Sequence, residues 1–442
     1  MKGQVFVSAG VVAVSLFVGR TGLSGVFDAT WIRGETDKDA VSYAIGEKMT
    51  FTLTVENFPS GVAKDGYWFD WRRGGDDGVV VSGRVALAEM PFVYTTSIDC
   101  PGFVELSGEL RDAKGNRVDK EKVGPWDPKF VFFHGGAGAA IEKLGPCDEP
   151  KDFDAFWQKQ FKRLDLIPIR DRKVEIPSPN PDVRLYAASV DCAGLAPVTG
   201  YLAIPKAVDR GAKFPARTRY HGYDGNIKER LPPTELKSDE IYFEVTAHGM
   251  RLRALGGTDA DYKALRWRVK SNGQTYGFDV KENEDPETAY FNGMVLRVKR
   301  SLQYVKTLPG WDGKNLKATG GSQGGLQTMW AAGCGEGVTE ADSSITWCCD
   351  IRRNSTRKGW FMPWTESMGY FDAVNWGKRA PRTCSVDISR AGLGDYTCPP
   401  MGIARLYNAM TCPKRIAWVQ GSTHGYVPPS KYPGRDAVRS AN

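Results

Sequence analysis

The sequence predicts an α/β fold in which a doubly wound, mostly parallel sheet follows a small all-β sandwich. Strand-like and helix-like segments alternate in the second part of the chain, whereas the first part holds strand-like segments separated by turns. The length of 442 residues, of which 41% are hydrophobic, suits two domains. We expect a signal peptide over residues 1–24, the sandwich over 25–134 and the larger domain over 135–442.

The amino terminus has the pattern of a secretory signal peptide. Lys2 precedes an apolar stretch over residues 5–18, and Arg20 and small residues around Ser24 follow it. The apolar stretch is short for a bilayer span, so cleavage is favoured over an uncleaved anchor. We therefore expect a secreted or periplasmic protein whose mature form does not associate with a membrane.

The sandwich is predicted from apolar and polar residues that alternate. Met49, Phe51, Leu53 and Val55 alternate with polar residues, as in a strand with one buried face. Similar segments cover residues 66–71, 79–87, 92–97 and 102–110, and glycine-containing turns separate them. This arrangement favours an immunoglobulin-like sandwich.

The sandwich is expected to be a structural spacer. We expect Tyr67, Trp68 and Trp71 to pack in its core rather than to bind carbohydrate. Glycines favour a loop over residues 133–139, and this loop marks the expected boundary between the two domains.

Charge gives no indication of a nucleic-acid partner. The net charge is +7, from 59 basic and 52 acidic residues, and no dense block of Lys and Arg is present. Residues 290–307 form a predicted amphipathic helix, and we expect the basic residues between Arg297 and Arg300 on its solvated face. Residues 198–204 and 242–246 are predicted strands of the parallel sheet.

A glycine-rich segment contains the strongest candidate for covalent chemistry. Ser322 lies in the run Thr319-Gly320-Gly321-Ser322-Gln323-Gly324-Gly325, between a predicted strand over 316–319 and a predicted helix over 326–332. Side chains at Gly320 and Gly324 would collide with the backbone that crosses such a turn. The pattern Gly320-Gly321-Ser322-Gln323-Gly324 indicates a nucleophilic serine. The alternative is a glycine-rich loop that contains a serine without a catalytic role.

A nucleophilic serine needs a base, and the chain has only four histidines: His134, His221, His248 and His424. In folds with this turn the acid and then the histidine follow the serine along the chain. Only His424 follows Ser322, directly after a strand-like segment over 415–420. Sites of open α/β sheets form at that edge of the sheet, so His424 is the expected base, with a surface-loop histidine as the alternative.

Asp395 is the favoured acid. It follows a predicted strand over 386–393 and precedes a helix that Pro399 and Pro400 open. Asp350 is the alternative, because it ends an apolar segment over 345–349 that we expect to be the next strand after the serine helix. Asp372 and Asp387 are weaker candidates. Asp387 is weaker because it would lie inside a strand.

Three motifs are more specific together than the serine turn alone. They are Gly320-Gly321-Ser322-Gln323-Gly324-Gly325, Asp395-Tyr396-Thr397-Cys398-Pro399-Pro400 and Glu149-Pro150-Lys151-Asp152-Phe153-Asp154-Ala155-Phe156-Trp157. Together they resemble the acetyl xylan esterase and cephalosporin C deacetylase family, over about residues 150–426. Members of this family are serine esterases of the α/β-hydrolase fold that remove acetyl groups from sugars and related small molecules.

The resemblance implies roles for five residues. Ser322 would be the nucleophile, Asp395 the orienting acid and His424 the base, with the backbone N–H groups of Tyr223 and Gln323 as the oxyanion hole. The segment Arg219-Tyr220-His221-Gly222-Tyr223-Asp224-Gly225 is similar to the family's oxyanion loop. The implied substrate is an acetylated poly- or oligosaccharide or a small acetyl ester, in a pocket that Tyr220 and Tyr223 close around a methyl group. No cofactor and no metal are expected, and a homo-oligomer is compatible with the resemblance.

Two positions depart from the family pattern. Gly425 follows His424 where the family usually has glutamate, and Ala247-His248-Gly249-Met250-Arg251 stands in place of an Arg-Gly-Gln motif. The second departure leaves quaternary structure and fine specificity open. The nine cysteines are an odd number, so in an oxidising compartment at least one stays unpaired or bridges two chains.

Other functions share these residues. A serine peptidase of the same superfamily or a general carboxylesterase would use the same three catalytic groups. A binding protein that had lost its activity is disfavoured, because both Ser322 and His424 are present.

Overall fold

The structure is a computed structural model that describes residues 25–121, 128–225, 227–270, 273–353, 359–429 and 437–440. The expected signal peptide over residues 1–24 lies outside these residues. Within them, no helix is both long enough and apolar enough to cross a membrane.

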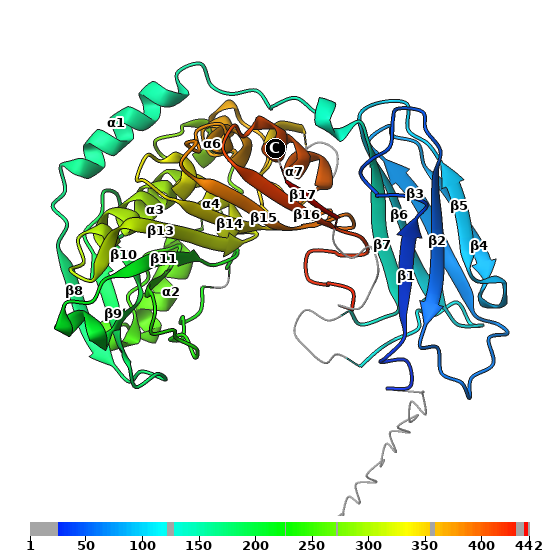
Figure 1. Cartoon of the computed structure of the whole chain (residues 1–442), viewed down its shortest axis with the longest axis horizontal. Coiled ribbons are helices and arrows are strands. Elements are labelled where there is room, and N and C mark those ends of the chain that lie inside the picture. The colour runs from blue at the N-terminus through cyan, green and yellow to red at the C-terminus, as the bar shows by residue number, and fades with distance from the viewer. Residues whose placement is uncertain are drawn as a thin grey trace, which may run out of the picture.

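The N-terminal part is a sandwich of two antiparallel sheets (Figure 1). One sheet has the strand order β1-β2-β5 and the other β4-β3-β6-β7. The strands are β1 (Trp31–Thr36), β2 (Met49–Glu56), β3 (Trp68–Gly75), β4 (Val81–Ala86), β5 (Phe92–Thr96), β6 (Gly102–Arg111) and β7 (Phe132–Ala139). The predicted all-β region is thus confirmed, while its likeness to immunoglobulin domains stays a prediction.

The aromatic residues of β3 and the turn before it differ in their environment. Tyr67 and Trp71 pack against the sandwich core, as expected. The expectation was wrong for Trp68, which is 37% exposed and lies beside the guanidinium group of Arg84. Trp68 alternates with the buried Phe69, so it belongs to the outer face of its sheet.

The predicted loop over residues 133–139 is wrong, because these residues form strand β7, which pairs with β6 along its length. The expected boundary after residue 134 falls inside this strand. Its glycines allow a close backbone approach instead of a turn. The Gly136 N–H donates to Gln420 Oε1 at 3.0 Å, and Gln420 Nε2 donates to the Gly136 carbonyl oxygen at 2.8 Å.

The larger part contains a ten-stranded sheet with the order β17-β16-β15-β14-β13-β11-β12-β10-β9-β8. Six neighbouring strands from β12 to β16 are parallel, and the strands at both ends are antiparallel. The strands are β8 (Asp171–Ile176), β9 (Val183–Val190), β10 (Val198–Pro205), β11 (Phe214–Tyr220), β12 (Ile241–Val245), β13 (Trp311–Gly321), β14 (Glu340–Ser344), β15 (Ser385–Gly392), β16 (Lys414–Val419) and β17 (Ala437–Ser440). The predicted mostly parallel sheet is confirmed.

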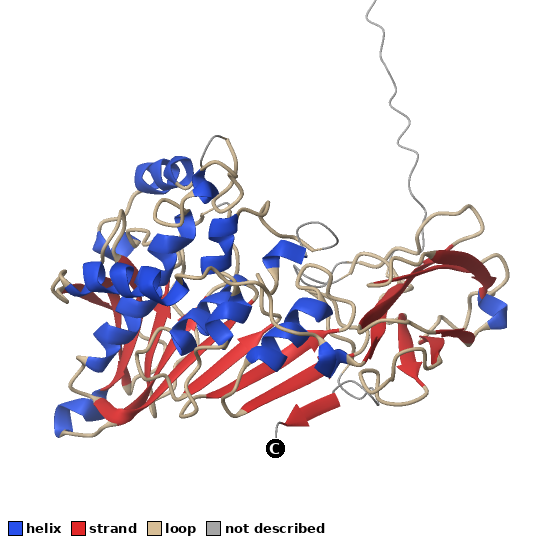
Figure 2. Ribbon diagram, turned by 90° about the horizontal axis from the view of Figure 1, so that it is seen from above, coloured by secondary structure: helices blue, strands red, loops and turns tan. Residues whose placement is uncertain are grey.

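Most helices lie on one side of this sheet (Figure 2). The helices are α1 (Phe153–Asp165), α2 (Asp259–Arg268), α3 (Tyr290–Lys306), α4 (Gln323–Gly333), α6 (Ala373–Gly377) and α7 (Pro400–Ala409). On the opposite face, the described parts of β11, β13, β14 and β15 carry polar side chains that are partly or fully exposed, including Arg219, Lys317, Asp342 and Ser389. The predicted double winding is therefore incomplete, since the second face of the sheet lacks a full layer of helices. A polar face can stay in contact with water and needs no such layer.

The strand after α4 begins earlier than predicted. β14 is the polar segment Glu340–Ser344, in which buried and more exposed residues alternate. This alternation suits a sheet with one solvent-exposed face. The apolar residues 345–349 lie beyond its end and are buried. Ile345 and Cys348 have φ angles of 41° and 58°, which no strand accommodates, so the strand predicted at 345–349 is wrong.

The basic residues of α3 are not on a solvated face. Arg297, Lys299 and Arg300 are only 5%, 7% and 1% exposed. Each binds backbone carbonyl groups of neighbouring segments: Arg297 Nε donates to Ala247, Lys299 Nζ to Cys334, and an Arg300 nitrogen to Leu164 and Ile167. These carbonyls lie at or near helix ends and in a loop, where basic side chains can supply donors that the backbone ladder does not. The expected solvated face is thus wrong.

A substitution at Gly394 tests the contact between the two parts of the chain. A Cβ at this position would overlap the carbonyl oxygen of His134 in β7. We expect Gly394→Ala to lower the free energy of unfolding by about 1–3 kcal/mol, the usual cost of overpacking, in chemical denaturation. Gly61→Ala is the matched control, because a Cβ there would meet no atom within 4 Å. Equal stability of the two variants would show that the contact relaxes freely.

Candidate active site

Ser322 occupies a strained turn between β13 and α4. Its φ and ψ angles are 58° and −120°, a backbone conformation that costs on the order of 1–3 kcal/mol for a residue with a side chain. Hydrogen bonds hold it on both sides. Its N–H donates to the Ser344 carbonyl at 2.9 Å, and its carbonyl accepts from the N–H groups of Leu326 and Trp347 at 3.0 and 3.1 Å.

The glycines beside Ser322 are required for the reason predicted from the sequence. A Cβ on Gly324 would overlap the carbonyl oxygen of Tyr220, and one on Gly320 would lie 2.8 Å from the same atom. The end of β11 at Tyr220, which pairs with Gly320 in the sheet, therefore lies directly against the turn. The predicted steric requirement at both glycines is confirmed.

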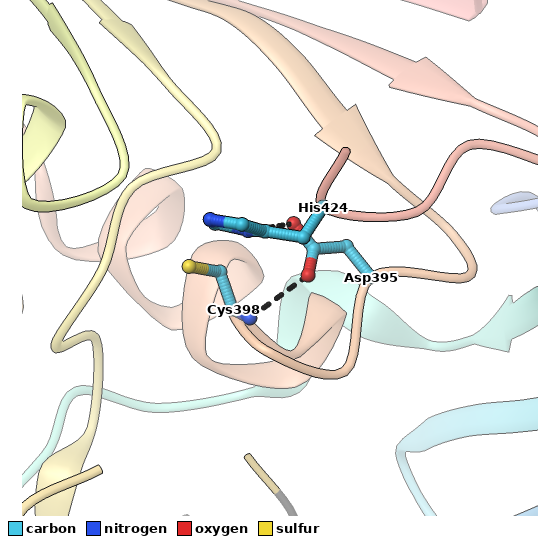
Figure 3. Close-up of side chains that lie close together, drawn as sticks. All are labelled: Asp395, Cys398 and His424. Atoms are coloured by element: carbon cyan, nitrogen blue, oxygen red, sulfur yellow. Dashed lines mark hydrogen bonds and ion pairs between the residues drawn. The ribbon is translucent and has the colours of Figure 1, made fainter. Parts of the chain in front are cut away.

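Asp395 and His424 meet at the carboxyl ends of β15 and β16, as Figure 3 shows. His424 Nδ1 lies 3.0 Å from Asp395 Oδ2. The aspartate is fully buried, and its other oxygen accepts the N–H groups of Thr397 and Cys398, both at 3.0 Å. These three hydrogen bonds fix the carboxylate and orient the imidazole, which is 28% exposed.

Cys398 lies beside this pair. The three side chains offer potential metal-ligand atoms within 4.8 Å of one another (Figure 3). Burial raises the pKa of the Cys398 thiol well above its usual value, with the Asp395 charge as a further cause. A neutral thiol is a poor ligand, and both oxygens of Asp395 are already hydrogen-bonded. The cluster therefore fits a carboxylate–imidazole pair better than a metal site, and the expected absence of a metal stays a prediction.

The alternative acids are engaged elsewhere. Asp350 Oδ2 lies 3.1 Å from Arg405 Nε. Asp372 caps α6 and accepts the N–H groups of Asp350, Ile351 and Val374. Asp387 lies inside β15, as expected, and pairs with Arg415. Among the described residues, only Asp395 forms a hydrogen bond with the His424 ring.

The segment that contains Tyr223 passes over the serine. A Cβ on Gly222 would lie 4.0 Å from the Ser322 Cβ, so the backbone of the two segments is adjacent. Gln323 is the first residue of α4, and its N–H has no acceptor within the helix. The structure thus brings residues 222–223 and 322–323 together. No hydrogen bond joins Ser322 to His424 among the described residues, and catalytic hydrogen bonds are often long before substrate binds.

His221 holds this segment in place. Its Nδ1 lies 2.7 Å from the Gly222 carbonyl, and its Nε2 accepts the Ala247 N–H at 2.9 Å, so the proton is assigned to Nδ1. Burial lowers the pKa of His221 to about 3, so the ring is neutral. This role could not be predicted from the sequence, because a histidine that bonds two backbone groups has no local motif.

The segment that departs from the Arg-Gly-Gln motif supports the same region. Gly249 has a φ angle of 62°, and a Cβ there would overlap the Pro197 carbonyl, so glycine is required. His248 Nδ1 lies 2.8 Å from the Tyr290 hydroxyl, and burial lowers the pKa of His248 well below its usual value.

Aromatic side chains form a cluster around Tyr223. Its ring stacks on Tyr276 with centroids 4.4 Å apart and meets the rings of Trp347 and Trp360 edge-on at 5.5 and 4.5 Å. The backbone N–H of Trp347 donates to the Ser322 carbonyl oxygen, and this bond links the cluster to the turn. Sequence reasoning missed the tryptophans. The expected role of Tyr220 beside the carbonyl is wrong, since its side chain is 1% exposed and bonds Ser301 in α3.

No disulfide bond joins the cysteines in the part of the chain that the structure describes.

Comparisons with known proteins identify relatives of this chain. The model of the acetyl xylan esterase family (AXE1) matches residues 142–366. Acetyl esterase Axe7A of Xylanibacter ruminicola is 29% identical over 299 residues, which cover 64% of this chain and 65% of the relative. The matched part is thus less than two thirds of that protein. The family match includes Tyr223, Ser322 and Gln323 and ends before Asp395 and His424.

Two solved structures have the same α/β-hydrolase fold. The acetyl xylan esterase from Paenibacillus sp. R4 has a TM-score of 0.54 and 21% identity, over 65% of this chain and 94% of that one. Acetyl xylan esterase 1 from Thermoanaerobacterium sp. JW/SL YS485 has a TM-score of 0.52 and 20% identity, over 64% and 92%. Because the family model covers half of the chain, this protein belongs to the acetyl xylan esterase family, a family of carboxylic ester hydrolases.

Proposed function

We propose that this protein is a secreted serine esterase that removes acetyl groups from acetylated saccharides through an acetyl-serine intermediate. The observation that carries the proposal is the strained Ser322 turn, with the buried Asp395 carboxylate bonded to the His424 imidazole beyond the ends of β15 and β16 in the same sheet. Family membership favours an ester over a peptide as the substrate. Export is proposed from the amino-terminal sequence pattern, and the acetylated saccharide from the names of the relatives.

The first chemical step would form the acyl-enzyme. Ser322 Oγ attacks the acetyl carbonyl carbon while His424 Nε2 takes the hydroxyl proton. Negative charge develops on the carbonyl oxygen, and the N–H groups of Tyr223 and Gln323 would stabilise it. The bond to the sugar oxygen then breaks, and the sugar leaves with the proton from His424. Asp395 keeps Nδ1 protonated, so that Nε2 is the atom that accepts and returns the proton.

The second step would release acetate. Water attacks the acetyl-serine carbonyl and gives a proton to His424, and the same two N–H groups stabilise the oxyanion again. The bond to Ser322 Oγ breaks, and the serine regains its proton from His424. Each N–H donor is worth about 2.7–4 kcal/mol of transition-state stabilisation in comparable sites.

Ser322→Ala tests the nucleophile. Alanine removes the hydroxyl and keeps the Cβ, so the fold should be unchanged while hydrolysis of p-nitrophenyl acetate falls by orders of magnitude. Circular dichroism of the purified variant provides the control for folding. More than a tenth of the wild-type rate in a folded variant would rule out Ser322 as the nucleophile.

Paired substitutions test the acid. Asp395→Asn should lower kcat by up to about 10⁴-fold, because the amide stabilises the wrong imidazole tautomer. Asp350→Asn is the matched control and should have a much smaller effect on kcat, because Asp350 faces Arg405 rather than His424. The opposite ranking of the two variants would assign the acid to the earlier position.

Acyl length distinguishes a deacetylase from a general carboxylesterase. If the walls of the pocket are packed around a methyl group, each added methylene must overpack them at about 1–3 kcal/mol. We expect kcat/KM for p-nitrophenyl acetate to exceed that for the butyrate by roughly tenfold or more. The leaving group is the same in both esters, so only the acyl group differs. Equal or faster hydrolysis of the butyrate would favour the general carboxylesterase.

A further inference from the structure

The outer face of the sandwich contains a groove that the proposed chemistry does not use. A cavity of about 540 Å³ lies over β3, β6 and β7. Most of the strand residues that line it alternate with core residues, so their side chains point away from the sandwich interior. They include Asp70, Arg72, Glu109, Arg117, Phe130 and Phe132.

One end of this groove adjoins the catalytic loops. The Phe132 ring lies 5.5 Å from the ring of Tyr426, which is two residues after His424. The next outward residue of β7, His134, also lines the groove. Its ring stacks on Tyr396 with centroids 5.2 Å apart and an angle of 11°, and Tyr396 directly follows Asp395. The groove therefore begins where the loops that carry Asp395 and His424 contact the sandwich.

The aromatic rings form a strip along the groove. Phe130 and Phe132 have ring centroids 5.6 Å apart, and Phe132 and Tyr426 continue the strip at 5.5 Å. These spacings are close to the length of one pyranose unit in an extended glycan. All three residues are half-buried rather than closed off in a core, and the guanidinium group of Arg117 lies over the Phe130 ring, 4.5 Å from its centroid. Sugars present apolar C–H faces that pack on such rings.

The polar residues of the groove suit hydroxyl groups rather than a charged polymer. Arg111 pairs with Asp70 at 2.9 Å, and Arg117 pairs with Glu109 at 2.7 Å, so charges of both signs are interspersed. A groove that follows phosphates would instead be lined by unpaired cations. Mixed donors and acceptors beside an aromatic strip match a neutral polyhydroxylated chain.

We propose that this groove binds the sugar units of the polysaccharide that flank the acetylated residue. The proposal rests on the proposed esterase function and adds a binding role to the sandwich. A polymeric substrate would extend from the acetyl group at Ser322 past Tyr426 and Phe132 toward Phe130. A small ester carries no flanking sugar units that could occupy the groove.

The test compares two substrates in one variant. We expect Phe130→Ala to lower kcat/KM for acetylated xylan by about three- to tenfold, mainly through KM, and to leave p-nitrophenyl acetate hydrolysis within twofold of wild type. Phe130→Tyr should restore activity on the polymer. Trp267→Ala is the matched control, because Trp267 is 69% exposed on α2, outside the groove. Unchanged kcat/KM on the polymer, or an equal loss on both substrates, would overturn the proposal.

A binding measurement separates this proposal from the esterase function. Acetylated xylo-oligosaccharides titrated into Ser322→Ala should bind several-fold more tightly than into Ser322→Ala/Phe130→Ala. Equal affinity would contradict the groove, whatever the outcome for catalysis. Affinity that falls steeply with added salt would indicate an anionic polymer and would overturn the assignment to a neutral glycan. If the wild type hydrolyses no acetyl ester at all, the esterase function fails, and the titration still tests the groove.

Discussion

The close backbone contact between β7 and the ends of β15 and β16 determines how the two parts of the chain form one unit. Gly136 exchanges two hydrogen bonds with the buried Gln420 side chain, and Gly394 lies against the carbonyl group of His134. Any side chain at Gly394 would separate these segments. Gln420 directly follows β16, and Gly394 directly precedes Asp395. The contact therefore fixes the bases of both loops whose ends form the carboxylate–imidazole pair.

A second constraint acts at the serine. The strained conformation of Ser322 persists because its N–H and carbonyl groups are bonded to neighbouring segments and because two glycines let the end of β11 at Tyr220 lie against the turn. The segment that contains Tyr223 is held by the neutral His221, which remains uncharged because burial lowers its pKa to about 3. The proposed reactive groups and the residues that support them therefore lie on short segments at the carboxyl ends of parallel strands, where the sheet itself fixes their spacing.

The sequence predicted those features whose cause is local. Steric limits at Gly320 and Gly324, the strand before His424 and the proline-opened helix after Asp395 all follow from neighbouring residues, and each is present. Features with a distant cause were missed. The glycines in β7 resembled a linker because their partner, Gln420, is distant in the sequence. The basic residues of α3 resembled a solvent-exposed face because the carbonyls that they bind belong to other segments. The same holds for His221, whose second partner is Ala247.

One strand face links the buried contact to the proposed groove. Residues 132, 134 and 136 of β7 alternate with core residues and point to the same side of the sheet. Along this face Gly136 lies against the Leu393 carbonyl group, His134 stacks on Tyr396, and Phe132 reaches Tyr426. The residue sizes increase as the two parts of the chain diverge, from a glycine at closest approach to a phenylalanine at the open end. The register that fixes the loops of Asp395 and His424 therefore also places Phe132 and the groove beside them, so a sandwich docked in this way cannot be a detached spacer.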